Sequence, residues 1–124
     1  MTAFLIGTRM MGYWSLILDV KTWIFSPRGA GWLFGKEVVE KFLNDNNIAM
    51  IVRAHQLAMD GWKSHFEDLV ITVWSAPNYC YRCGNVASIL ELDENLEKMY
   101  KIFEDAPDEE RNKEAKFPLS NYIS

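Results

Sequence analysis

The sequence predicts a partly buried α/β unit, because two short apolar runs accompany one stretch of helical periodicity. Residues 48–52 and 69–74 form the two runs, and the second is rich in β-branched side chains. Runs of this kind are typical of strands that are buried on both faces of a sheet. Each run is followed by polar or turn residues, and α/β folds usually place their sites at such strand exits.

The first half of the chain predicts one loop and one helix. Residues 1–13 show no clear periodicity, so no element is predicted there. The sequence Ser-Pro-Arg-Gly-Ala-Gly at 26–31 predicts a turn-rich loop. A helix is then predicted to begin at Gly35 and to end within 44–47. Its apolar stripe consists of residues at helical spacing, namely Val38, Val39, Phe42 and Leu43.

The second half predicts a β-hairpin and a tail. Residues 86–92 and 98–103 are two further strands around a turn at 93–95. Residues 104–124 carry mixed charge with many acidic side chains and few apolar ones. Such a composition does not supply enough apolar surface to order a segment, so a flexible tail is predicted.

Composition excludes several classes of protein. The net charge of the 124 residues is −4, which argues against an electrostatic nucleic-acid binder. The apolar opening is interrupted by glycine and charged residues, which argues against a membrane span or a signal peptide. Two cysteines are too few for a disulfide scaffold, so we expect a cytoplasmic protein that can also be nuclear. The five tryptophans are expected in the core or at domain contacts.

Three residues at loop positions are candidates for a site. His55 follows the first buried run and is either a metal ligand or a core histidine bonded to a backbone carbonyl. Arg28 lies among glycines, where its guanidinium can bind a phosphate or remain a solvated surface group. Tyr79 is either a positioned phenol or an aromatic that packs its own loop. Taken alone, these residues indicate no more than an anion-binding site.

Cys80 and Cys83 form a CxxC pair, for which two interpretations remain open. With His55 and His65 the pair could complete a Cys₂His₂ zinc site. The spacing matches no common zinc finger, which favours two small residues in a loop.

Three motifs together resemble the phosphoprotein phosphatase family, in its order and at its usual separations. They are residues 26–31, the sequence Arg-Ala-His-Gln at 53–56, and Ser-Ala-Pro-Asn-Tyr-Cys-Tyr-Arg-Cys-Gly-Asn at 75–85. The last motif resembles the type 2A branch, and residues 31–35 and 72–74 resemble its type 4 and type 6 members. The resemblance runs from residue 14 to 103. It implies the C-terminal half of a calcineurin-like metallophosphatase domain, an incomplete β-sandwich flanked by helices, after an unmatched segment at 1–13.

The resemblance implies a role for each candidate residue. His55 resembles the family's last histidine metal ligand, Arg28 the arginine that holds the substrate phosphate, and Tyr79 the tyrosine that lines the phosphate pocket. Gln56 would neighbour the metal ligand. Cys80 and Cys83 would lie in the flexible loop beside the site.

The family's activity is also implied by the resemblance. Its members hydrolyse phosphoserine and phosphothreonine with water activated by two divalent metal ions, which are manganese or iron and zinc. The implied partners are phosphoprotein substrates and regulatory or scaffold subunits, with no nucleic acid or membrane.

The chain departs from the family pattern in its metal ligands. The motifs Gly-Asp-x-His-Gly, Gly-Asp-x-x-Asp-Arg-Gly and Gly-Asn-His-Glu, which supply the family's other ligands, do not occur in the sequence. One imidazole cannot hold two metal ions, so we expect a truncated phosphatase without activity on its own and with marginal stability. The alternative is a non-catalytic interaction module that binds regulatory subunits.

Overall fold

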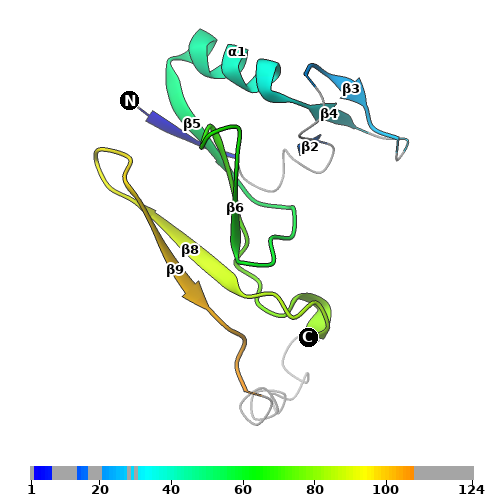
Figure 1. Cartoon of the computed structure of the whole chain (residues 1–124), viewed down its shortest axis with the longest axis vertical. Coiled ribbons are helices and arrows are strands. Elements are labelled where there is room, and N and C mark those ends of the chain that lie inside the picture. Colours follow the sequence, from blue (N-terminus) through cyan, green and yellow to red (C-terminus); the bar gives the residue numbers. More distant parts are fainter. Residues whose placement is uncertain (1, 7–13, 17–20, 28, 30, 108–124) are drawn as a thin grey trace, which may run out of the picture.

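The structure, a computed structural model, describes residues 2–6, 14–16, 21–27, 29 and 31–107. These residues form a mixed α/β fold of three small sheets, one α-helix and one 3-10 helix (Figure 1). The elements in chain order are β1 (Thr2–Ile6), β2 (Trp14–Leu16), β3 (Ile24–Phe25), β4 (Trp32–Phe34), α1 (Lys36–Asn46), β5 (Ile48–Arg53), β6 (Trp62–His65), β7 (Val70–Val73), η1 (Tyr79–Tyr81), β8 (Ala87–Leu92) and β9 (Lys98–Phe103). The predicted α/β class is confirmed.

The central sheet has the strand order β1-β5-β7-β6. Strand β5 pairs in parallel with β1 on one side and with β7 on the other, and β6 pairs with β7 as an antiparallel neighbour. Ile51, Val52, Val70 and Ile71 are all buried, as expected for strands covered on both faces. The two strands predicted from the apolar runs are thereby confirmed.

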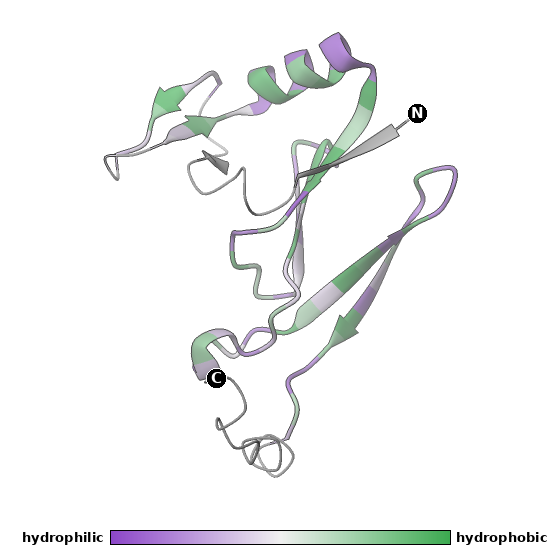
Figure 2. Ribbon diagram, turned by 180° about the vertical axis from the view of Figure 1, so that it is seen from behind, coloured by the Kyte–Doolittle hydropathy of each residue, from purple (hydrophilic) through white to green (hydrophobic). Residues whose placement is uncertain are grey.

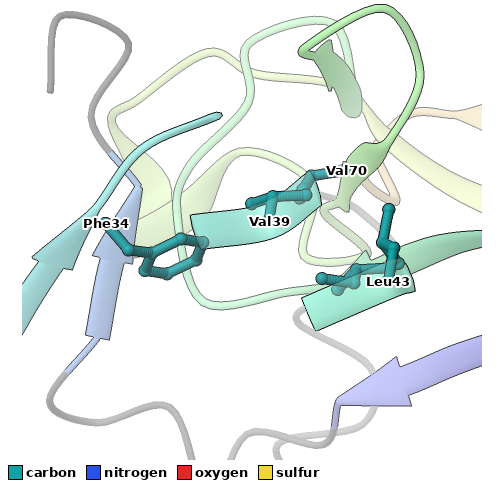
Figure 3. Close-up of a cluster of buried hydrophobic side chains, with 5 residues drawn as sticks. Phe34, Val39, Leu43 and Val70 are labelled. Carbon is teal, nitrogen blue, oxygen red and sulfur yellow. The ribbon is translucent and has the colours of Figure 1, made fainter. Parts of the chain in front are cut away.

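Helix α1 covers one face of this sheet. Val39 and Leu43 of the helix pack with Phe34 against Ile51 of β5 and Val70 of β7 (Figure 3). The helix ends at Asn47, which adopts a left-handed backbone with φ 53° and donates its N–H to carbonyls of the last turn. The predicted stop is confirmed, and of the predicted apolar stripe Val39 and Leu43 belong to the core cluster and Val38 packs against it, whereas Phe42 is exposed.

The hairpin of β8 and β9 covers the opposite face. Because side chains alternate along a strand, Met50, Val52 and Ile71 point away from α1. They form a second cluster with half-buried hairpin side chains, among them Leu90 and Tyr100. Figure 1 shows the hairpin and α1 on opposite sides of the central strands. Both predicted hairpin strands are present and pair in antiparallel fashion.

Gly61 joins the central sheet to the hairpin. It adopts φ 79°, and a Cβ built on it would lie 2.7 Å from the carbonyl carbon of Ala87. The Gly61 carbonyl oxygen accepts hydrogen bonds from the Trp74 N–H at 2.7 Å and from the Ser88 hydroxyl at 2.6 Å. Only a residue without a side chain allows the two backbones to approach this closely.

The structure differs from the sequence prediction at its N-terminal side. Residues 2–6, where no element was predicted, form β1 against β5. A further small sheet with the order β2-β4-β3 was also not predicted. Trp23 and Trp32, expected in the core or at domain contacts, are 40% and 47% exposed. Figure 2 shows hydrophobic segments in β3 and β4, and within β4 Leu33 and Phe34 are buried.

Candidate active site

His55 is the second residue beyond the carboxyl end of β5. Its backbone has φ 80°, and its side chain is exposed. A non-glycine residue in the left-handed region is strained and persists only where its surroundings hold it. The strained backbone of the turn at His55 must therefore be held by contacts from neighbouring residues.

Arg53, the last residue of β5, is placed to fix that turn. Its side chain is only 2% exposed, and its Nη1 donates to Thr72 Oγ1 at 3.3 Å and to Gln56 Oε1. Thr72 lies directly opposite Arg53 in the parallel pair of β5 and β7. Burial lowers the pKa of Arg53 to about 10, so the guanidinium remains charged at neutral pH. The Gln56 side chain thus turns back onto the sheet and closes the turn around His55.

Tyr79 lies in a second loop, which follows β7. Its ring meets the Trp74 ring edge-on, with centroids 4.9 Å apart. Asn78, Cys80 and Tyr81 all have positive φ, between 44° and 58°. The loop is therefore a strained segment held by specific contacts, as is the turn at His55.

The two loops border one hollow of about 640 Å³. It is lined by residues from the exits of β5 and β7 and from the loop beyond, namely Ala54, His55, Leu57, Val73, Trp74, Ser75, Ala76, Tyr79, Cys80, Arg82 and Cys83. Four of the six predicted site residues are thus brought together. Gln56 faces Arg53 instead and is not among the lining residues. Arg28 lies outside the residues that the structure describes.

The described residues do not form a metal centre by themselves. No group of three or more His, Cys, Asp or Glu side chains within them is arranged to hold an ion. His55 is the single imidazole in the hollow, so the dinuclear centre that the resemblance implies does not fit the described residues.

The alternative zinc site is wrong for a related reason. His65 lies on β6, where its Nε2 is 3.3 Å from Thr72 Oγ1. His65 is not among the residues that line the hollow with Cys80 and Cys83, and both cysteines are free thiols. Burial lowers the pKa of His65, and the positive charges of Lys63 and Arg53 act in the same direction.

Two supporting residues of the site were not predicted. Asn85 is 3% exposed and binds three backbone groups of the second loop, and Arg53 binds Gln56 and Thr72. The signals for Arg53 were its place at the end of a buried apolar run and within the motif at 53–56. Asn85 follows glycine in a loop, which by itself predicts a turn and no more.

Comparison with known proteins relates this α/β unit to the metallophosphatases. Residues 9–59 match the family model of the calcineurin-like phosphoesterases. Among solved structures, the chain is similar to a protein serine/threonine phosphatase from Saccharomyces cerevisiae that has similarity to human phosphatase PP5. The sequence identity is 26% and the TM-score is 0.65. The match covers 77% of this chain and 33% of that phosphatase, so the chain spans about a third of its length. The fold of the described residues thus matches part of a metallophosphatase fold.

Proposed function

We propose that the chain is part of a protein serine/threonine phosphatase of the type 2A kind, closest to the type 4 and type 6 members. The observation that carries this proposal is that His55 and Tyr79, from two different strand exits, border the same hollow. In this function Arg28 binds the phosphate of a phosphoserine or phosphothreonine and Tyr79 lines the phosphate pocket.

Metal ions of such an enzyme would supply an acidified water molecule. Within the described residues His55 is the candidate ligand, and the remaining ligands would have to come from elsewhere. The chain alone is therefore proposed to bind phosphate without turning over a phosphopeptide. Its proposed setting is cytoplasmic or nuclear, with phosphoproteins and regulatory subunits as partners. Within the described residues, no helix has both the length and the apolar character to cross a membrane.

Phosphate binding can be tested by NMR on the isotope-labelled chain. Inorganic phosphate should shift the amide signals of His55 and Tyr79, and Arg28→Gln should abolish both shifts. Lys21→Gln is the matched control, because it removes one exposed positive charge without touching the motifs. Equal responses in all three proteins would contradict the proposed phosphate pocket.

Turnover needs a separate assay with a phosphoserine peptide and manganese. No product is expected from the chain alone. Turnover that disappears in His55→Asn and persists in His65→Gln would show that the chain is a complete catalyst, contrary to the proposal.

A non-catalytic interaction module is the second candidate function. It is favoured by the exposed aromatic pair of Phe25 and Trp32, whose rings meet edge-on 5.6 Å apart on the β3–β4 strands. Large apolar side chains that remain exposed together often mark a protein-binding surface. Binding of a regulatory subunit that is lost in Trp32→Ser and kept in Arg28→Gln would favour this function.

A further inference from the structure

The side chain of Asn85 connects the two aromatic residues that wall the hollow. Its Nδ2 donates to the carbonyl oxygen of Ala76 at 2.9 Å and to that of Val86 at 2.9 Å. Its Oδ1 accepts the backbone N–H of Tyr79 at 2.8 Å. These partners define the orientation of the amide, because a reversed amide would place its oxygen against two carbonyl oxygens.

The same carbonyl of Ala76 also accepts the indole N–H of Trp74, at 2.7 Å. One oxygen therefore fixes the Trp74 ring and the Asn85 amide, and that amide in turn holds the Tyr79 backbone. The edge-on contact of the Trp74 and Tyr79 rings follows from this arrangement. Asn85 itself is 3% exposed and cannot exchange these bonds for water without moving.

The backbone of the loop needs such a support. Asn78, directly before Tyr79, has φ 44°, and its N–H donates to the Asn85 carbonyl oxygen at 2.8 Å. Cys80, directly after Tyr79, has φ 56°. Non-glycine residues in left-handed conformations revert to ordinary ones unless surrounding contacts determine them. Asn85 holds the Asn78 end of this segment, accepting the Asn78 N–H at its backbone oxygen and the Tyr79 N–H at its side-chain oxygen.

We propose that Asn85 is a positioning residue that holds Tyr79 against Trp74 at the wall of the hollow. The proposal rests on the proposed function, in which Tyr79 lines a phosphate pocket. Asn85 does not line the hollow, so it acts through Tyr79 and not on the substrate.

The test uses Asn85→Asp, which keeps the shape and the acceptor for Tyr79 but turns the donor into an oxygen. Asn95→Asp is the control, since Asn95 is exposed in the hairpin turn. The first readout is the NOE between the Trp74 and Tyr79 rings. The NOE between Trp62 and Tyr100, whose rings stack 4.0 Å apart beside the hairpin, reports that the fold is intact.

In wild type and Asn95→Asp, both NOEs are expected. In Asn85→Asp, loss of the Trp74–Tyr79 NOE with the Trp62–Tyr100 NOE retained supports the proposal, and retention of both overturns it. If both NOEs disappear in Asn85→Asp, the same two NOEs are measured, and judged by the same criterion, in Asn85→Ser, which removes the Asn85 hydrogen bonds without adding a charge. Loss of both in Asn85→Ser also overturns the proposal, since Asn85 would then hold the whole fold.

A titration with inorganic phosphate separates this inference from the proposed function. The phosphate-induced shift of the Tyr79 amide should be lost in Asn85→Ser while that of His55 remains. A wild-type chain without any phosphate response counts against the proposed function alone, because the ring NOEs still decide the role of Asn85.

Discussion

Replacing Gly61 by alanine tests how closely the central sheet and the hairpin are joined. The added Cβ would lie 2.7 Å from the carbonyl carbon of Ala87, 2.9 Å from its oxygen and 2.9 Å from the nitrogen of Ser88. All three atoms belong to the backbone, so no side-chain rotation can relieve the contact. Either β8 or the turn before β6 must move.

The expected loss of stability has three parts. An alanine at φ 79° costs about 1–2 kcal/mol in the left-handed region. Overpacking against a fixed backbone costs about 1–3 kcal/mol. Moving the turn also lengthens the bonds that the Gly61 carbonyl accepts from Trp74 and Ser88, at about 1 kcal/mol each. The free energy of unfolding should therefore fall by about 4–7 kcal/mol.

The measurement is urea unfolding followed by circular dichroism, with Gly84→Ala as the matched control. Gly84 has φ 65°, but a Cβ there meets no atom within 4 Å. Gly84→Ala has the same conformational cost without the steric one, so the free energy of unfolding should fall by only about 1–2 kcal/mol. The reasoning is refuted if Gly61→Ala and Gly84→Ala lower the unfolding free energy equally.

Three further changes test the polar and aromatic contacts. Burial lowers the pKa of His65 in the folded state, so the unfolded state binds the proton first as pH falls below about 6.5, and the folded state loses stability. His65→Gln removes this titration and should therefore reduce the pH dependence of the unfolding free energy in that range. Equal pH dependence of the urea midpoint in both proteins would contradict this. Tyr100→Leu should lower the free energy of unfolding by about 0.5–1.5 kcal/mol because it removes the stacking on Trp62, whereas Tyr100→Phe keeps the stacking and should not. Arg53→Met should lower the free energy of unfolding by about 1–3 kcal/mol, because it removes the hydrogen bond to Gln56. An unchanged urea midpoint would show that the turn does not depend on Arg53.

The elements that the sequence predicts correctly are those with a clear local period. Helix α1 shows an apolar stripe, and strands β5 and β7 show continuous apolar runs. By contrast, β3 has two residues and β4 three, too few to display any period. Strand β6, Trp-Lys-Ser-His, is largely polar and is recognised only through its pairing with β7.

The candidate site was predictable in part for the same reason. The strand exits of β5 and β7 were visible in the sequence, and these exits bring His55 and Tyr79 to one hollow. The contacts that hold the loops join Arg53 to Thr72 and Asn85 to Ala76. Such contacts depend on how separate segments meet, and no local pattern encodes them.

The exposure of Trp23 and Trp32 has a related origin. Tryptophan is expected to be covered because its ring buries a large area. Coverage, however, depends on tertiary neighbours: the Trp23 ring contacts Phe34 and the Trp32 ring contacts Phe25, yet both tryptophans stay 40% and 47% exposed. Composition therefore predicts that an aromatic ring needs a neighbour but not whether that neighbour is present.

The strand order β1-β5-β7-β6 also determines when each strand can pair during synthesis on the ribosome. Strand β1 leaves the tunnel first, yet its partner β5 emerges only after the β2-β4-β3 sheet and α1. The other edge of β5 remains unpaired until β6 and then β7 have emerged from the tunnel. Until β7 has emerged, strand edges of this sheet therefore remain unpaired in the nascent chain, and a chaperone or a second nascent chain can occupy them.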